Sequence, residues 1–137
     1  MNIVEITGGQ KFQREIAHKT VAYCIDKLLP RHRTLDIEIK LVTIKSDATG
    51  YAMVGDTNRQ FEIEIDKNQT IKELVTTICH EMVHVKQYAR KEIDGIRLRW
   101  KGKDIPEGTD YINFPWEIEA YDLQEDLADD IWYKGIV

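Results

Sequence analysis

The sequence predicts an α+β fold in a single domain spanning residues 1–137. Three segments repeat apolar residues at helical spacing, and the stretch between the first and second alternates apolar with polar residues. The chain is 42% hydrophobic and 31% charged, which is typical of a globular domain long enough to bury its own core.

The first part of the chain predicts one helix and three strands. The helix covers residues 10–29, where apolar side chains recur about every four residues, and Pro30 ends it. Residues 35–44 then alternate apolar and polar side chains, as expected of a strand with one buried face. Shorter strands are predicted at residues 51–54 and 61–66, with turn-forming residues between them. Three short strands joined by tight turns predict an antiparallel meander.

A second helix is predicted over residues 70–91. Thr70 and Glu73 match a capping box, which marks a helix start. Residues 93–114 contain glycines, a proline and scattered aromatics, so an irregular loop is expected there, with a small hairpin around Trp100–Lys103.

The second predicted helix contains the pattern His-Glu-X-X-His, from His80 to His84. Residues four apart share one helix face, so both imidazoles can reach one metal ion, and Glu81 can accept a proton from water bound to it. A helical wheel places both histidines opposite an apolar stripe. This position indicates that the two side chains face a cleft and are not part of the hydrophobic core. Cys79 points towards that stripe and is expected to be a small buried residue. The pattern predicts a zinc metallohydrolase, most simply a peptidase.

A catalytic zinc ion usually has three protein ligands and a water molecule, and no histidine follows His84. A last helix is predicted over residues 115–132, with proline in its first turn. On its wheel Glu119 joins a continuous acidic face, whereas Glu117 lies on a flank poor in charge. We therefore predict Glu117 as the third ligand and Glu119 as a surface charge, with Glu119 as the alternative ligand. Asp110 lies in a segment close to the GTxD pattern of aspartate-ligand enzymes, but one residue early.

Composition limits the other classes of function. The net charge of −5 argues against general nucleic-acid binding. The chain does not start like a signal peptide, and no apolar stretch approaches the roughly 18 residues of a membrane span. Cys24 and Cys79 match no paired-cysteine motif, so reduced thiols in a cytoplasmic protein are expected.

A run of basic residues follows the histidine motif, and it consists of Lys86, Arg90, Lys91, Arg97, Arg99, Lys101 and Lys103. We expect the acidic last helix to neutralise this run within the fold. The alternative is a basic rim that recruits an acidic substrate or, less readily, DNA.

The histidine motif, together with an ExxA motif that starts at Glu117, resembles the gluzincin clan of zinc metallopeptidases. The predicted order of elements is similar to that of minigluzincins, of ImmA/IrrE-type and SprT-like proteins, and of uncharacterised phage proteins. The resemblance implies a zincin-like fold, zinc held by His80, His84 and Glu117, and hydrolysis of a peptide or protein substrate with Glu81 as general base. It also implies a small sheet whose edge strand aligns that substrate. The chain lacks the third histidine of SprT-like proteases and has Tyr121 where ImmA-type proteins typically have Asn, so the subfamily is not assigned.

A non-catalytic binding or assembly module with a zincin-like fold is the alternative. Structural zinc sites are usually closed and often use thiolates, but neither cysteine is placed to close this one, and Glu81 would have no purpose. A peptidase that acts on a single partner also fits so short a chain. Tyr111 and Tyr121 are candidate donors to an oxyanion, although a buried structural role is expected for each.

Overall fold

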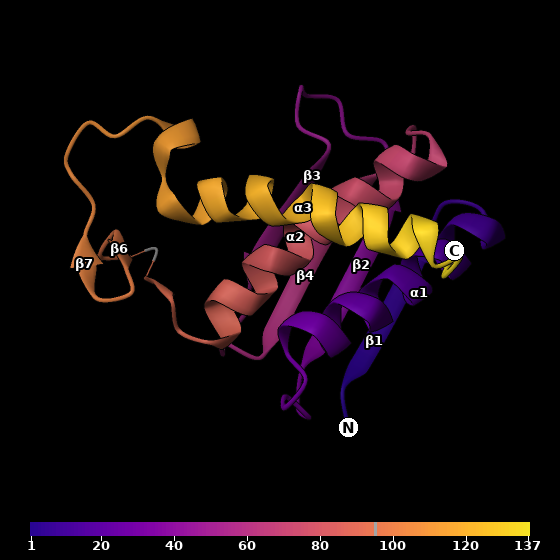
Figure 1. Ribbon diagram of the computed structural model, residues 1–137, viewed down its shortest axis with the longest axis horizontal. Helices are drawn as coiled ribbons and strands as arrows, with labels where there is room; N and C mark the ends of the chain where they lie inside the picture. Colours follow the sequence, from indigo (N-terminus) through magenta and orange to yellow (C-terminus); the bar gives the residue numbers. More distant parts are fainter. Residues whose placement is uncertain (95) are drawn as a thin grey trace.

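The computed structural model describes residues 1–94 and 96–137 (Figure 1). Within these residues the elements are β1 (Ile3–Gly8), α1 (Lys11–Leu28), β2 (Asp36–Val42), β3 (Gly50–Val54), β4 (Gln60–Asp66), α2 (Ile71–Ala89), β5 (Ile93–Asp94), β6 (Arg99–Trp100), β7 (Lys103–Asp104), the 3-10 helix η1 (Tyr111–Asn113) and α3 (Pro115–Tyr133). The predicted α+β class is confirmed. Helices α1 and α2 pack side by side on one face of the larger sheet, and α3 crosses in front of α2.

The larger sheet has the strand order β1-β2-β4-β3. Strands β1, β2 and β4 are parallel, and only β3 runs antiparallel, along the outer side of β4. The predicted antiparallel meander is therefore wrong, and β1 is a strand that we did not predict. Alternation of apolar and polar residues identifies the buried face of each strand, but it determines neither the neighbour of a strand nor its direction.

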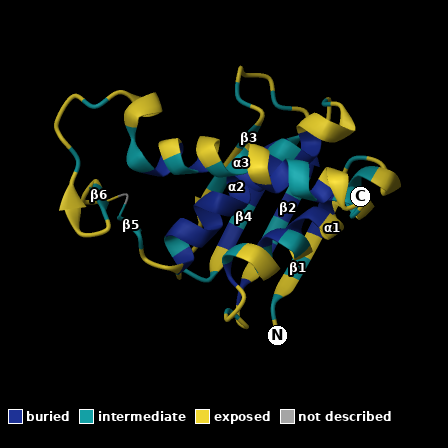
Figure 2. Ribbon diagram, viewed as in Figure 1, coloured by how far each residue is buried: buried dark blue, intermediate teal, exposed yellow. Residues whose placement is uncertain are grey.

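Alternation does place the core. Ile37, Ile39 and Leu41 of β2 are buried beneath the helices, while Glu38 and Lys40 lie on the opposite, uncovered face of the sheet. Helix α2 is buried along most of its length, because the sheet covers one side and α3 covers the other (Figure 2). The polar stripe of α2 consequently faces another helix.

Local sequence sets the helix starts as predicted. The Thr70 hydroxyl accepts a hydrogen bond from the Glu73 N–H (3.2 Å), and the Glu73 carboxylate accepts one from the Thr70 N–H (2.8 Å). Helix α3 begins at Pro115, which has no N–H to leave unpaired. The predicted hairpin around Trp100–Lys103 is present as β6 and β7, and β5 pairs with β6. None of the helices in the described part of the chain is both long and apolar enough to cross a bilayer.

Candidate metal centre

Two turns of α2 and the first turn of α3 bring three metal-ligating side chains together. Nε2 of His80 lies 3.0 Å from Oε1 of Glu117, and Nε2 of His84 lies 3.2 Å from Oε2 of the same carboxylate. One ligand atom from each residue fits within 4.8 Å of the other two, and all three residues are buried. This buried His-His-Glu group can bind a metal ion.

The outer nitrogen of each imidazole is held by a glutamine. His80 donates its Nδ1–H to Oε1 of Gln124 (2.7 Å), and His84 donates its Nδ1–H to Oε1 of Gln87 (2.8 Å). An amide oxygen only accepts, so a neutral ring in this position has its lone pair on Nε2. Both lone pairs then face a carboxylate, which is repulsive unless positive charge lies between them. Hydrogen bonding at the outer nitrogen is the usual way in which proteins orient a ligating histidine.

The Gln87 amide has a fixed orientation. Its Nε2 donates to the main-chain carbonyl of Trp116 (2.9 Å) and to the carboxylate of Glu119 (3.1 Å), which leaves Oε1 for His84. Glu119 also pairs with Lys86 at 2.8 Å. Glu119 is therefore not in the ligand cluster, and the prediction that it is one more solvated surface charge is wrong. Glu119 is a half-buried carboxylate of α3 that contacts Lys86 and Gln87 of α2.

The electrostatics of the cluster follow from its burial. Burial acts to lower the pKa of His84, but hydrogen bonding and attraction from Glu117 outweigh it and raise the pKa above the ordinary 6.5. Burial acts to raise the pKa of Glu117, but hydrogen bonds from His80 and His84 outweigh it and lower the pKa to about 2. The cluster thus attracts positive charge at neutral pH.

Glu81 lies beside the cluster rather than in it. It is 6% exposed, and burial raises the pKa of its carboxyl group. A Cβ placed on Gly50 of β3 would come within 3.2 Å of Oε2 of Glu81 and 3.0 Å of Thr77 Cγ2, so a glycine gives the carboxylate its room. We did not single out Gly50 from the sequence.

A cavity of about 540 Å³ opens next to these residues, between β3, α2 and the end of the loop before α3. His80, Glu81, Gly50, Tyr111 and Tyr121 are among the residues that line it. A smaller cavity of about 160 Å³ continues past the cluster, between Ala52 of β3 and Trp116 of α3, and is also lined by Glu81. β3 is an edge strand of the larger sheet in the described chain, and its residues Gly50 and Tyr51 line both cavities.

Both tyrosines are more exposed than expected. Tyr111 is 61% exposed and Tyr121 is 49% exposed, so the expectation of buried structural roles is wrong. The Tyr121 ring packs edge-on against His80, with 4.7 Å between the ring centroids. Burial of the hydroxyl group and the nearby Glu117 carboxylate raise the pKa of Tyr111. Both tyrosines line the larger cavity and are partly exposed to solvent.

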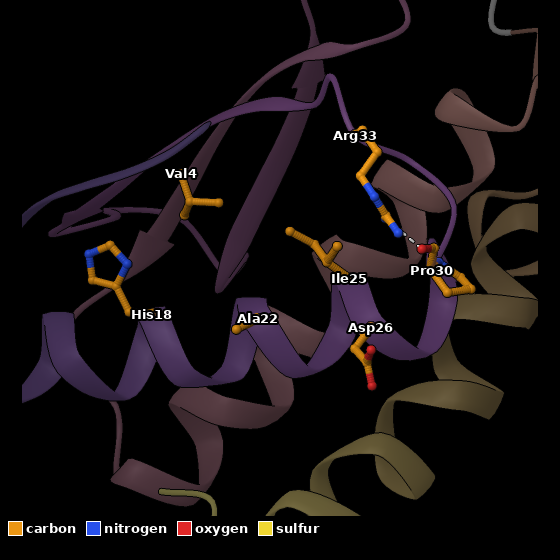
Figure 3. A pocket seen from close by; sticks show the side chains of 7 residues that line it. All are labelled: Val4, His18, Ala22, Ile25, Asp26, Pro30 and Arg33. Carbon is orange, nitrogen blue, oxygen red and sulfur yellow. Dashed lines mark hydrogen bonds between the residues drawn. The ribbon is translucent and has the colours of Figure 1, made fainter. Parts of the chain in front are cut away.

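The remaining candidates lie elsewhere. Cys79 is fully buried, as expected, and its Sγ lies 3.8 Å from that of Cys24. Asp110 precedes η1 and is not part of the cluster. His18 lines a separate cavity of about 400 Å³ between α1 and β1, where Arg33 bonds back to the Pro30 carbonyl instead of facing the ring (Figure 3).

Gln87 and Gln124 are functional candidates that we did not select from the sequence, although their helical spacing from the proposed ligands could have identified them. Gln87 follows His84 by three positions and Gln124 follows Glu117 by seven, so each shares a helix face with a proposed ligand. Scans of the chain against protein-family models, curated proteins and solved structures each return no match.

Proposed function

We propose that this protein is a zinc-dependent metallopeptidase. The observation that carries the proposal is the convergence of His80, His84 and Glu117 with both outer imidazole nitrogens already hydrogen-bonded. The two imidazoles contact different oxygens of Glu117, at 3.0 and 3.2 Å, and one ligand atom from each of the three residues lies within 4.8 Å of the others, so these side chains could hold a zinc ion. Two imidazole nitrogens and one carboxylate oxygen form one of the donor sets of catalytic zinc sites, which leave one position for water.

The residues around the cluster support hydrolysis. A zinc ion held there would supply Lewis acidity and lower the pKa of a bound water molecule towards neutrality. Glu81 accepts the proton as water attacks the scissile carbonyl, and then delivers it to the leaving amine. Tyr111 and Tyr121 line the larger cavity, where a hydroxyl group can donate to the developing oxyanion.

The free edge of β3 supports an extended peptide as the substrate. A peptide laid along Gly50–Val54 can add a strand to the sheet through main-chain hydrogen bonds. Gly50 lies against Glu81, so a peptide on this edge would bring a carbonyl group near the proposed general base. The cavities on either side have room for side chains.

Zinc per chain, measured by elemental mass spectrometry on the untagged protein, tests the metal site. We expect one zinc ion in the wild type and its loss in His84→Ala and Glu117→Ala. Asp126→Ala is the matched control, because Asp126 is an exposed carboxylate of the same helix. A wild-type protein that takes up no zinc after reconstitution would refute the proposal and leave a metal-free binding or assembly module as the better account.

Hydrolysis needs its own test. Glu81→Gln should keep the zinc ion but lose cleavage of any substrate found by screening a quenched-fluorescent peptide library. Full turnover by Glu81→Gln would show that the general base is another residue. A zinc-loaded protein that cleaves nothing in the library would next be tested on whole-protein mixtures, because a peptidase restricted to one partner ignores generic peptides.

A further inference from the structure

Positive charge is concentrated in residues 90–104, which we call the basic lobe. They contain six Lys or Arg residues and three Asp or Glu residues, a net charge of +3 in a chain whose net charge is −5. Helix α3, the nearest acidic element in the sequence, contains seven carboxylates and no Lys or Arg. From the sequence, we expected these two elements to neutralise each other.

The structure bears out that expectation only in part. Within the described residues, Lys86 is the one member of the basic run that forms an ion pair with α3, through Glu119. Arg99 pairs with Asp104 inside the lobe itself, at 2.8 Å. Within the described residues Lys91, Arg97, Lys101 and Lys103 form no ion pair, and all four are exposed. The described part of the lobe therefore carries four exposed cations without an ion-pair partner.

The lobe lies at one end of the molecule, away from the larger sheet (Figure 1). It is continuous with the metal centre, because Trp100 of β6 packs 6.5 Å (between ring centroids) from Trp116, which lines the smaller cavity beside His84. A peptide that leaves this cavity past Trp116 would next meet β6.

Between the lobe and α3 lies a groove of about 480 Å³ with an apolar floor that includes Trp100, Ile118 and Leu123. Its α3 wall also carries Asp122 and Glu119, and Glu119 is paired with Lys86. Lys101 forms part of its rim and lies over the Trp100 ring, 5.2 Å from the centroid. Ile96 at the tip of the lobe is 96% exposed. The surface therefore combines apolar contact area with unpaired positive charge, and the groove has the size of a ligand site.

We propose that the basic lobe and this groove form a docking site for an acidic, partly apolar segment of a protein substrate. That the bound segment belongs to a substrate rests on the proposed function. Binding of an acidic segment to the lobe does not depend on that function. A peptide fits better than a nucleic acid, because DNA carries about one negative charge every 1.7 Å and would run into the carboxylates of α3. A short peptide can instead place apolar residues in the groove against α3 while its acidic residues pair with the lobe.

Fluorescence anisotropy with a labelled peptide of four Glu-Glu-Leu repeats tests the site. We expect this probe to bind more tightly than the matched Gln-Gln-Leu peptide, and less tightly as salt rises. The variant with Arg97→Glu, Lys101→Glu and Lys103→Glu should bind it about tenfold or more weakly. The control carries Lys11→Glu, Lys19→Glu and Lys27→Glu on α1, which gives the same change in net charge, and should bind it within about twofold of the wild type.

Three results would overturn the inference. Equal weakening in the lobe and α1 variants, or no saturable binding, would mean that only net charge acts. Tighter lobe-dependent binding of a 12-nucleotide single strand would make the partner a nucleic acid. Loss of peptide binding in His84→Ala would place the peptide at the metal centre instead. The assay needs neither zinc nor turnover, so a negative binding result would not refute the metallopeptidase proposal. Failure of the metallopeptidase proposal would likewise leave the binding result unaffected.

Discussion

Replacing Gln87 by methionine tests how the contact between α2 and α3 prepares His84 for a metal ion. Gln87 is fully buried, and it accepts the His84 Nδ1–H while donating to the Trp116 carbonyl and the Glu119 carboxylate. Methionine keeps the length of the side chain but forms none of the three hydrogen bonds, each of which contributes about 1 kcal/mol to the unfolding free energy. Their buried partners would be left unpaired, which lowers the stability further. We expect the zinc-free variant to lose about 3–5 kcal/mol of unfolding free energy.

Zinc affinity should fall as well. Loss of a hydrogen bond to a ligating histidine typically weakens metal binding by about 10–100-fold, which corresponds to about 1.4–2.7 kcal/mol. The dissociation constant is measured by competition with a chromophoric chelator, and stability by urea unfolding of the zinc-free protein. Gln69→Met is the matched control, since Gln69 bonds the Asp66 carbonyl and the Thr77 hydroxyl but no proposed ligand. It should lose stability and keep its zinc affinity. If Gln87→Met binds zinc as tightly as the wild type, the orientation of His84 does not depend on this amide.

Two further predictions concern stability. Gly50→Val should lower the unfolding free energy by about 1–3 kcal/mol, because the valine side chain would collide with Thr77 and Glu81. Urea unfolding measures this change, and a variant as stable as the wild type would contradict the close packing at Gly50. The zinc-free wild type should exceed Glu117→Gln in stability most clearly between pH 4.5 and 6.5, the ordinary pKa values of the two partners. The pKa of Glu117 is lowered in the folded protein, so the stability that its carboxylate contributes is lost as the pH falls from 4.5 towards 2. The pKa of His84 is raised in the folded protein, so the stability that its imidazolium contributes is lost as the pH rises through that raised pKa. A stability difference that stays constant from pH 3 to pH 9 would rule out the pair.

The sequence predicts the elements of this fold better than their arrangement. A capping box and a first-turn proline are local signals, so α2 and α3 begin where they were expected. Strand pairing is not local. Residues 35–44 and 61–66 each show a buried face, yet nothing in either pattern says that β2 and β4 pair in parallel with β3 outside them. Strand β1 carried a usable signal, because Ile3-Val-Glu-Ile-Thr7 is rich in β-branched residues.

The convergence of His80, His84 and Glu117 was easier to predict than its surroundings. Helical spacing alone puts His80 and His84 on one face, and the lack of neighbouring charge separates Glu117 from Glu119. The wheel suggested an open cleft because a polar helix stripe usually faces solvent. Here α3 covers that stripe, so both histidines are only 8% exposed. Which residues of α3 lie opposite α2 depends on how the two helices cross, and that cannot be derived from either helix alone.

Charge balance supports the proposal that the His-His-Glu group holds a divalent cation. Glu81 and Glu117 are both buried, and two ionised carboxylates so close together are costly without compensation. Burial and, to a smaller extent, the Glu117 carboxylate raise the pKa of Glu81, the proposed general base. A divalent cation held by the histidines and Glu117 would balance the charge of both carboxylates. Its field would also lower the pKa of Glu81 and so favour the ionised carboxylate, the form that can accept a proton from water.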